Sequence, residues 1–512
     1  MSAMEENLIA AGLAIGYVLF WLVATELLGR KEILAKPDAR KVLHIVLGNI
    51  VLFLPLFVDK WVAFLVPVLF IPANFLMTPY SPIKQLRLDT FEAGHALGTV
   101  YYPISLAVIT WFGFDHPWLL VVSFFPLAYG DGLAAVTGVR AKDGHIQAIG
   151  GQKSLLGSWT FVWATFLSII GGLSVFLVFG VIDYTFEFVL LAASLAVLVG
   201  VTVEFFSPKG LDNLLIPLIT LPTFFFLEPY LVEAALNIDL FHFSVGLLVA
   251  TLLMVLGWGG KALTIDGGLG GCFMGILIMA LGGWTLGIAL LLFFVVGTLV
   301  TKVGKKRKGD VTFEKGSTKR DSMQAMAKAG FASIVAILML FTNDSPIVMV
   351  IVVATMGTSL ADTVGTEIGT MSKSTPRPIL APWRVAKKGE SGAVSAVGTL
   401  AALVAALLYT IVLYVFALFD PSMVNELPVE ALVVVPVAAL LGMFADSIIG
   451  VTLQEQRRCE VCGSKVEVKE HCDQVTTKVS GFRFFHNDLV NFSATTLGGL
   501  IAGVIGLLLW GF

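Results

Sequence analysis

Long uncharged apolar runs recur from one end of this 512-residue chain to the other, and they constrain its fold more than any other feature. Hydrophobic residues make up 57% of the chain and charged residues 13%. Soluble proteins average about 45–50% apolar and about 25% charged residues. An apolar run of about 20 residues crosses a bilayer as a helix, which satisfies its own backbone hydrogen bonds. The sequence therefore predicts an all-α, polytopic integral membrane protein.

The loops between the apolar runs alternate in charge. Roughly sixteen runs have spanning length. The basic loops include 30–41, 302–320 and 454–483, whereas 113–117 and 228–240 are neutral or acidic. Because short basic loops stay on the cytoplasmic side, the basic set is expected to face the cytoplasm. We therefore predict a multi-pass protein of the cell membrane with its active sites facing the cytoplasm.

The acidic segment in the middle of the chain divides it into two halves of about eight spans each. Because eight is even, the second half repeats the orientation of the first, which makes the two halves parallel repeats. We predict a membrane domain over 1–228, a linker over 229–240 and a second membrane domain over 241–512.

Polar side chains gather at the predicted cytoplasmic ends of the spans in the first half. An acidic group at membrane depth costs several kcal/mol unless it is paired, hydrated or bound to a metal. The candidate residues are Arg40, Lys41, His44, Glu92, His95, Asp131, Lys153, Ser154, Gly157, Ser158, Glu204, Asp212 and Asn213.

The second half places polar residues at matching spans. Asp131 is followed seven residues later by Gly138, and Asp362 is followed by Gly369 at the same distance. The candidate residues of this half are Arg320, Asp321, Gln324, Asp362, Glu367, Ser391, Thr399, Asp446, Asn487, Asp488 and Asn491.

These residue types suit phosphoryl transfer at a membrane surface. Hard carboxylate oxygens bind Mg²⁺, and the N–H groups at a helix start favour phosphate. We therefore predict phosphoryl transfer to or from a lipid, with no nucleic acid as partner. For any single carboxylate, the alternative is a helix cap or topology marker. For the whole chain, the alternatives are a cytidylyltransferase that makes a CDP-lipid and a membrane transporter. A transporter is disfavoured because the acids lie at one surface and not at the midplane.

The loop 454–486 contains the stretch CEVCGSKVEVKEHC. Cys459 and Cys462 form a C-x2-C-G pair, and His471 and Cys472 follow as a second pair. A C-x2-C-G pair followed by a second ligand pair predicts a small structural zinc site, although the two pairs are close together and adjacent His–Cys ligands are less usual. The alternative is a set of reduced or redox-active thiols.

The first half resembles the integral-membrane polyprenol kinases, namely dolichol, phytol and farnesol kinase, which are distant relatives of phosphatidate cytidylyltransferase. The resemblance covers most of residues 35–225 and rests on RKVLHIVLGN, YGDGLAAVTG, GGQKSLLGS and EFFSPKGLDNLLIP. It implies phosphorylation of a prenyl alcohol, typically with CTP. It also implies that carboxylates hold metal and triphosphate, and that a lysine and two serines contact phosphates. The residues concerned are Asp131, Glu204 and Asp212 for metal and Lys153, Ser154 and Ser158 for phosphate.

The second half resembles the transmembrane protein 19 family, which includes plant phytyl-phosphate kinase. The resemblance covers roughly residues 260–505 and rests on RDSMQAMAKAG, SLADTVGTEIGTMSK, GESGAVSAVGTLA, ADSIIGVTLQ and HNDLVNFSATTLGG. It implies that this half adds a phosphate to a prenyl monophosphate. The implied functional carboxylates are Asp362, Glu367, Asp446 and Asp488.

Together, the two resemblances imply a bifunctional membrane isoprenoid kinase. It converts a phytol-, geranylgeraniol- or farnesol-like alcohol to the monophosphate and then to the diphosphate, using CTP or another nucleoside triphosphate with Mg²⁺. The predicted catalytic residues are Asp131, Lys153, Asp212, Asp362, Asp446 and Asp488. The predicted nucleotide contacts are Arg40, Lys41, His44, Ser154, Gly157, Ser158, Asn213, Arg320, Gln324, Ser391, Asn487 and Asn491.

Overall fold

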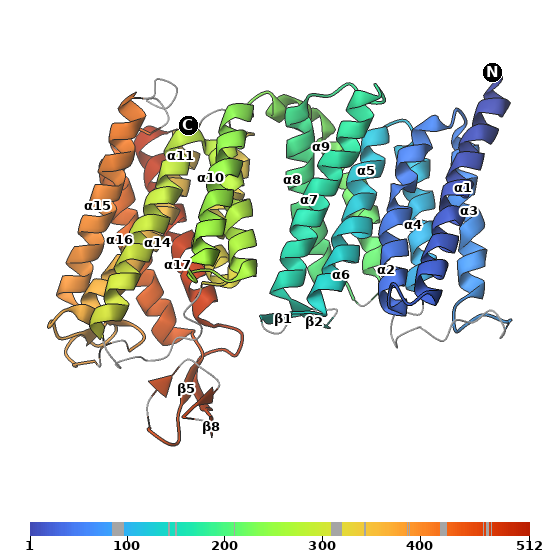
Figure 1. Cartoon of the computed structure of the whole chain (residues 1–512). Helices are drawn as coiled ribbons and strands as arrows, with labels where there is room; N and C mark the ends of the chain where they lie inside the picture. The colour runs from blue at the N-terminus through green and yellow to red at the C-terminus, as the bar shows by residue number, and fades with distance from the viewer. Residues whose placement is uncertain are drawn as a thin grey trace. The chain divides into compact units, whose positions relative to one another are not determined.

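The computed structural model consists mainly of helices, with short β-strands in some of the connections (Figure 1). It describes residues 1–83, 97–141, 144–148, 151–208, 210–308, 320–342, 345–386, 388, 390–419, 427–463, 465–466, 470–472 and 474–511. The predicted all-α polytopic membrane class is confirmed, because many of the helices are long and apolar enough to cross a membrane.

The chain divides into two compact units, unit 1 over Met1–Asn237 and unit 2 over Ile238–Phe512. The boundary falls inside the segment 229–240, whose first residues belong to the last helix of unit 1. The elements of unit 1 are α1 (Ala3–Arg30), α2 (Lys36–Leu47), η1 (Gly48–Leu56), α3 (Lys60–Leu76), α4 (Gly98–Gly113), α5 (Pro117–Phe125), η3 (Pro126–Asp131), α6 (Gly132–Gly138), β1 (His145–Ala148), β2 (Gly151–Ser154), α7 (Leu155–Val178), α8 (Phe186–Phe206) and α9 (Asp212–Ala235).

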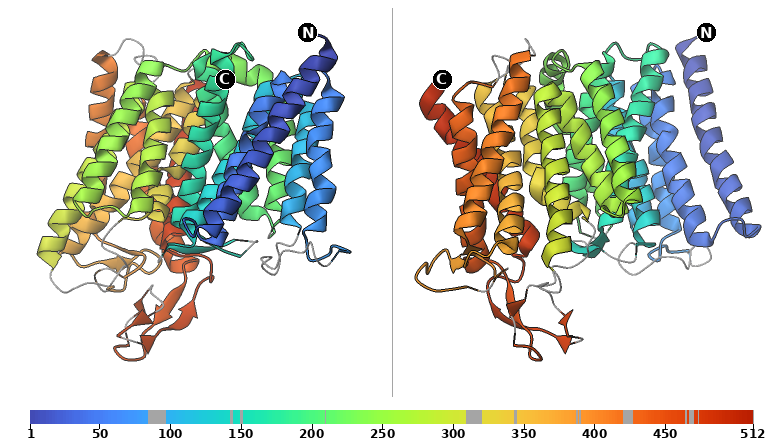
Figure 2. Two further views of the ribbon diagram at one scale, coloured as in Figure 1. Left: turned by 45° about the vertical axis from the view of Figure 1, so that its right-hand side comes forward. Right: turned by 60° about the vertical axis from the view of Figure 1, so that its left-hand side comes forward.

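Unit 2 is also a helical bundle, and it carries a group of small strands, β5 to β9, between its last two helices. Its elements are α10 (Leu240–Gly259), α11 (Ile265–Lys308), α12 (Ser322–Ala325), η4 (Met326–Gly330), α13 (Phe331–Met339), α14 (Pro346–Met371), β3 (Arg377–Pro378), β4 (Ala393–Val394), α15 (Ala396–Phe419), α16 (Ala431–Thr452), β5 (Gln456–Arg458), β6 (Lys465–Val466), β7 (Glu470–His471), β8 (Gln474–Val475), β9 (Thr477–Ser480) and α17 (Asn487–Trp510). Figure 2 shows that the strands β5 to β9 project beyond the ends of the helices of this unit.

Thirteen helices in the described residues are long and apolar enough to cross a membrane, so the predicted count of sixteen is not confirmed. The differences lie in three helices. α3 and α4 have 17 and 16 residues, which is short for a span. α11 runs for 44 residues with a kink at Gly283, where φ is 55°. Glycine reaches this backbone region readily, so two apolar runs follow each other without a polar loop between them.

The helix that carries the key aspartate is the most buried candidate span in each unit. In unit 1 it is the run Pro117–Gly138, which is 67% buried, and in unit 2 it is α14, which is 78% buried. In unit 1 this run passes from α5 through the π-helix η3 into α6, and Asp131 ends the π-helix. π-Helical turns inside α-helices are frequent at functional sites. The most buried helix of each bundle therefore positions the carboxylate.

Polar side chains cap the first turns of several helices that carry candidate residues. Ser154 Oγ accepts the Gly157 N–H (3.0 Å) at the start of α7, and Asp321 accepts the Gln324 N–H (3.0 Å) at the start of α12. Each cap satisfies an N–H group that has no partner within its helix. The alternative role considered for single acids, a helix cap, is thus the observed role of Asp321.

Short antiparallel strand pairs precede α7 and α15. β1 pairs with β2 from His145↔Ser154 to Ala148↔Gly151, and β3 pairs with β4 through Arg377↔Val394 and Pro378↔Ala393. In both units the chain therefore leaves the aspartate-bearing helix, forms a β pair and enters the next long helix at a serine.

Candidate functional site

In unit 1, the side chain of His44 lies beside that of Asp131. His44 Nε2 is 4.0 Å from an Asp131 carboxylate oxygen and 3.2 Å from the Leu127 carbonyl oxygen. Gly132 makes this approach possible, because a Cβ there would lie 2.5 Å from Ile45 Cγ1. Asp131 is one-fifth exposed, so the carboxylate remains accessible at the end of a buried helix. The sequence placed both residues among the candidates, and the structure brings them together.

Lys153 and Glu204 form a buried ion pair beside this group. The Lys153 ammonium on β2 contacts the Glu204 carboxylate on α8, and it also donates to the Glu204 carbonyl oxygen (3.1 Å). The charges of Asp131, Lys153 and Glu204 all act on the carboxylate of Asp212, at the start of α9. Three carboxylates and one ammonium from four elements therefore share one region of unit 1.

The first residues of α9 are tied to α4. The Asn213 amide donates to the Gly98 carbonyl oxygen (3.1 Å), and the Asn213 N–H donates to Asp212 Oδ1 (2.9 Å). Asn213 therefore positions Asp212 by holding the start of α9 against α4. Arg40 and Lys41 lie in α2, and their charges act on His44.

Helices α6 and α7 cross at small residues next to the acids of unit 1. A Cβ on Gly157 would lie 3.2 Å from the Ala134 carbonyl oxygen and 3.2 Å from Gly138 Cα. Ala134 and Gly138 are four residues apart, a spacing of small residues that lets membrane helices pack closely. Ser154 caps α7 at this crossing, and Ser158 follows Gly157 in the same helix.

Unit 2 contains the same crossing between α14 and α15. A Cβ on Gly398 would lie 2.8 Å from the Gly365 carbonyl oxygen and 3.2 Å from Gly369 Cα. Ser395 Oγ accepts the Gly398 N–H at 3.1 Å, as Ser154 does for Gly157.

The serine of this second crossing differs from the one that the sequence singled out. We predicted Ser391, whose hydroxyl instead donates to Gln454 (3.2 Å) near the end of α16. The pattern S-x-x-G-S/T occurs as SLLGS from Ser154 and as SAVGT from Ser395, and it was the available signal.

Asp362 pairs with a lysine that the sequence reasoning missed. Lys328, in the π-helix η4, places its ammonium 3.5 Å from an Asp362 carboxylate oxygen and donates to Thr363 Oγ1 (2.8 Å). The Ser359 hydroxyl donates to the Lys328 carbonyl oxygen (2.9 Å), which fixes η4 against α14. The available signal was a lysine between alanines in an apolar run, AMAKAG.

Helices α14, α16 and α17 of unit 2 meet in one layer, one helical turn from Asp362 and Asp446. A Cβ on Gly442 of α16 would lie 2.5 Å from Thr358 Cγ2 of α14 and 3.1 Å from the Ala494 carbonyl oxygen of α17. Residues three and four apart share a helix face. One turn from this layer, α14 presents Asp362, α16 presents Asp446 and α17 presents Asn491. These three predicted residues therefore lie at one level of the bundle, on the helix faces that meet in this layer.

The other predicted residues of unit 2 lie around this group. The Arg320 backbone is held by bonds with Ala262 and Thr264, and its side chain interacts with the charge of Glu367. Burial lowers the pKa of the Arg320 guanidinium, and the Glu367 carboxylate acts in the opposite direction. Gln324 lies in α12, and Asn487 and Asp488 open α17. His486 Nδ1 is 3.8 Å from an Asp488 carboxylate oxygen. Glu92 and His95 of the first half lie outside the described residues.

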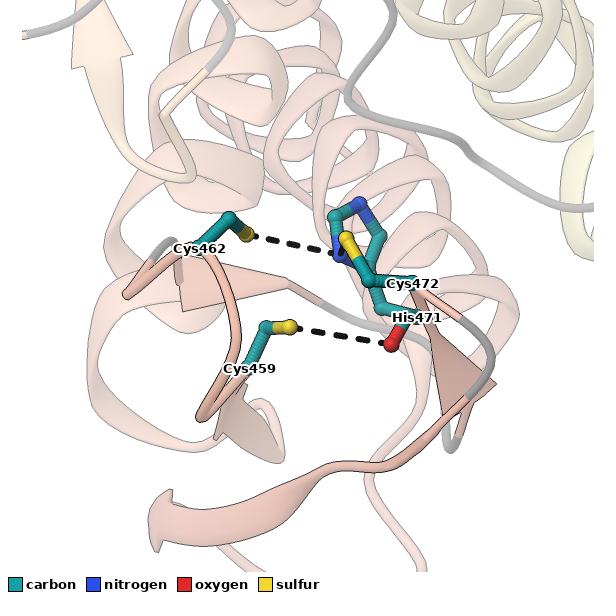
Figure 3. A group of neighbouring side chains, drawn as sticks. All are labelled: Cys459, Cys462, His471 and Cys472. Atoms are coloured by element: carbon teal, nitrogen blue, oxygen red, sulfur yellow. Dashed lines mark hydrogen bonds between the residues drawn. The ribbon is translucent and has the colours of Figure 1, made fainter.

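The predicted zinc ligands converge at the end of unit 2 (Figure 3). The ligand atoms of Cys459, Cys462, His471 and Cys472 all lie within 4.8 Å of one another. In the described part of the chain, they form the single group of three or more His, Cys, Asp or Glu residues close enough to hold one ion. A hydrogen bond from the Cys462 N–H is the main cause of a lowered pKa of the Cys459 thiol.

Comparison with known proteins gives a family for the chain. Residues 248–499 match the profile of the family described as Integral membrane protein DUF92. Protein PGR of Arabidopsis thaliana is 29% identical over 282 residues, which cover 52% of this chain and 96% of that protein. The phytol kinase of Synechocystis sp. is 33% identical over 218 residues, which cover 41% of this chain and 88% of that enzyme. The chain belongs to the family of this phytol kinase.

A further relative of this chain is an uncharacterized membrane protein of Methanocaldococcus jannaschii. It is 24% identical over 266 residues, which cover 52% of this chain and 95% of that protein. No solved structure gives a significant match. The region that matches DUF92 lies entirely within unit 2, which contains Lys328, Asp362 and Asp446.

Proposed function

We propose that the chain is a bifunctional membrane isoprenoid kinase. Unit 1 phosphorylates a prenyl alcohol, and unit 2 phosphorylates the resulting monophosphate to the diphosphate. The observation that carries this proposal is the repeated arrangement of an aspartate on the most buried span, a β pair, a serine cap and a crossing at small residues. The membership in the phytol kinase family supports the first reaction.

The donor set of unit 1 fits Mg²⁺ that arrives with a nucleotide. Mg²⁺ is usually held by one or two carboxylates together with substrate phosphates and water. Asp131 and Asp212 supply two carboxylates in one region, whereas the Glu204 carboxylate is engaged by Lys153. Our proposal therefore assigns metal binding to Asp131 and Asp212 and a positioning role to Glu204. The ion would neutralise charge on the triphosphate of the nucleotide. We propose CTP as this nucleotide.

The remaining groups of unit 1 position the reactants. The first N–H groups of α7 are largely used, since Leu155 donates to Gly144 (2.7 Å) and Gly157 donates to Ser154. We therefore assign phosphate contacts to Lys153 and to the Ser158 hydroxyl. His44 Nε2 already faces the Leu127 carbonyl oxygen, so the imidazole orients Asp131 and does not serve as the base. Catalysis by such a site comes mainly from positioning and charge neutralisation.

Unit 2 carries a charge arrangement that suits an anionic substrate. Lys328 stands directly beside Asp362, and Arg320 lies near Glu367. A prenyl monophosphate brings negative charge that a prenyl alcohol lacks, so the acceptor site needs a cation next to its metal-binding carboxylate. We assign Lys328 to the acceptor phosphate and Asp362 and Asp446 to the metal. From the basic loops, we place both sites on the cytoplasmic side of the cell membrane.

Labelled nucleotide tests the proposed reaction type. Membranes that contain the chain are incubated with a panel of prenols and with CTP or ATP labelled at either the α- or the γ-phosphate. The proposal expects γ-label in a prenyl monophosphate first and a diphosphate later. Transfer of α-label to lipid would identify a cytidylyltransferase instead. Absence of label from every lipid, in membranes that contain folded protein, would contradict a kinase and favour a transporter.

A further inference from the structure

The described residues of the strand-rich segment between α16 and α17 form almost no hydrophobic core. Among those from 454 to 486, the buried side chains are Gln454, Cys459 and Thr476. Apolar side chains in this described part are exposed, Val461 by 58% and Val475 by 70%. A segment of this size cannot hold one fold by apolar burial, and such segments usually need disulfides or a metal.

Two hairpins of this segment bring four ligands together. β5 and β6 pair through Arg457↔Val466 and Arg458↔Lys465, and Cys459 and Cys462 lie in the turn between them. The Gly463 N–H donates to the Cys459 carbonyl oxygen (2.9 Å), and Gly463 has a φ of +68°. This glycine closes a tight turn that directs both thiols to one side (Figure 3).

The second hairpin supplies the other pair of ligands. β7 and β8 pair through Glu470↔Val475 and His471↔Gln474, and Cys472 adopts a φ of +51° in the turn. A non-glycine residue with positive φ is uncommon and costs strain. This backbone conformation lets the adjacent side chains of His471 and Cys472 both face the first hairpin.

The two sulfur–nitrogen separations at His471 are close to those of a tetrahedral zinc site. Zn–S bonds of about 2.3 Å and Zn–N bonds of about 2.0 Å place a tetrahedral sulfur–nitrogen pair about 3.5 Å apart. His471 Nδ1 lies 3.5 Å from Cys462 Sγ and 3.2 Å from Cys472 Sγ. We propose that Cys459, Cys462, His471 and Cys472 bind one structural Zn²⁺ through three thiolates and the imidazole Nδ1.

Four protein ligands fill the tetrahedron, so the ion has no open position for catalysis. Binding releases the three thiol protons, and the three thiolates, the neutral imidazole and Zn²⁺ together carry one negative charge. None of the four ligands is assigned a role in the proposed kinase reactions, and all four lie in the strand-rich segment.

Backbone hydrogen bonds tie the two ends of the strand-rich segment together beside the flanking helices. The Phe482 N–H donates to the Leu453 carbonyl oxygen (2.9 Å), and the Glu455 N–H donates to the Phe485 carbonyl oxygen (2.9 Å). These bonds join the residues just after α16 to those just before α17. Zinc therefore orders a segment whose two ends are fixed to the helices that carry Asp446 and Asp488.

Metal content of the purified full-length protein tests the site. Protein is purified in detergent with a reductant and without chelator, and zinc is measured per chain. We expect about one zinc in the wild type and less than a fifth of that in Cys459→Ser and Cys462→Ser. The matched control is Cys272→Ser, because Cys272 is a buried free cysteine in α11 and is expected to leave zinc unchanged.

A second measurement separates metal loss from misfolding. Wild-type protein stripped of metal is loaded with Co²⁺, and the expected spectrum has thiolate-to-cobalt charge transfer and the intense d–d bands of a tetrahedral site. Limited proteolysis of the segment is expected to speed up at least tenfold after zinc removal. Three results would overturn the proposal. The first is a zinc content at background level after zinc is added back, and the second is an octahedral cobalt spectrum. The third is a disulfide between these cysteines in protein purified under reducing conditions.

Discussion

The corresponding aspartates of the two units, Asp131 and Asp362, lie beside different partners. In unit 1, Asp131 faces the imidazole of His44, and the nearby lysine, Lys153, is engaged by Glu204. In unit 2, Lys328 pairs directly with Asp362. The crossings beside these acids, by contrast, match closely in glycine positions and serine caps.

Under the proposed function, this difference separates the part of each site that serves the reaction from the part that serves the substrate. The shared crossing packs the start of a serine-capped helix against the helix that carries the aspartate, and the proposed phosphoryl transfer needs such positioning in both units. The cation beside the carboxylate differs, and so does the charge of the proposed acceptors. The comparison therefore predicts that substitutions at the acids remove one reaction each, whereas substitutions at the lysines have different effects in the two units.

The largest expected effect is that of Asp131→Asn. The substitution removes one of two carboxylates assigned to the metal, so phosphorylation of a prenol should fall about 1000-fold. The measurement is the initial rate of γ-label transfer to the alcohol at saturating nucleotide. Asp183→Asn, in an exposed loop of the same unit, is the matched control and should retain wild-type activity. Full activity in Asp131→Asn would remove this residue from the site.

The next effect concerns the stability of unit 1. Lys153→Met leaves the buried Glu204 carboxylate without its ammonium partner, which should cost about 3 kcal/mol of unfolding free energy. The measurement is thermal unfolding of the purified protein in detergent. The double variant Lys153→Met/Glu204→Leu removes both charges and should recover most of that stability without recovering activity. A single variant as stable as the wild type would contradict the buried pair.

A smaller effect is expected for Lys328→Met in unit 2. Loss of the cation beside Asp362 should raise the KM for a prenyl monophosphate about tenfold and leave the phosphorylation of the alcohol unchanged. Lys302→Met, at an exposed position of α11, is the control. If Lys328→Met slows both steps equally, the lysine does not distinguish the two substrates.

The smallest effect tests the crossing itself. A Cβ on Gly157 would meet Ala134 and Gly138 at 3.2 Å, so Gly157→Ala should cost about 1–2 kcal/mol through overpacking. Gly171→Ala in the same helix has no atom within 4 Å of the new Cβ and should be neutral or slightly stabilising. Equal unfolding temperatures for the two variants would show that the crossing is not closely packed.

Much of this architecture could be predicted from the sequence because apolar runs and charged loops report directly on membrane helices. The matched spacing of Asp131–Gly138 and Asp362–Gly369 predicted a correspondence, and the structure adds matching crossings at these glycines. The span count was less predictable, because α3 and α4 are short and Gly283 kinks α11 without a polar loop.

The partners of the acids were beyond sequence reasoning. Lys328 lies 34 residues before Asp362, and Lys153 lies 51 residues before Glu204. Because the partners of each pair are far apart in the sequence, only the tertiary structure shows that they pair. Ser391 was predicted and Ser395 was missed, because both lie in one polar stretch and the position where α15 begins decides which serine caps it. The convergence of Cys459, Cys462, His471 and Cys472 was easier to predict, because the four residues lie within one short loop and their spacing suggested a shared site.

Separate supply of the two substrates tests the central claim, that each unit performs one phosphorylation. Asp131→Asn and Asp362→Asn are each given a prenyl alcohol or a prenyl monophosphate with γ-labelled nucleotide. We predict that Asp131→Asn forms diphosphate from added monophosphate but leaves the alcohol unchanged, and that Asp362→Asn converts the alcohol and stops at the monophosphate. Loss of both steps in either variant, with the protein still folded, would contradict two independent sites.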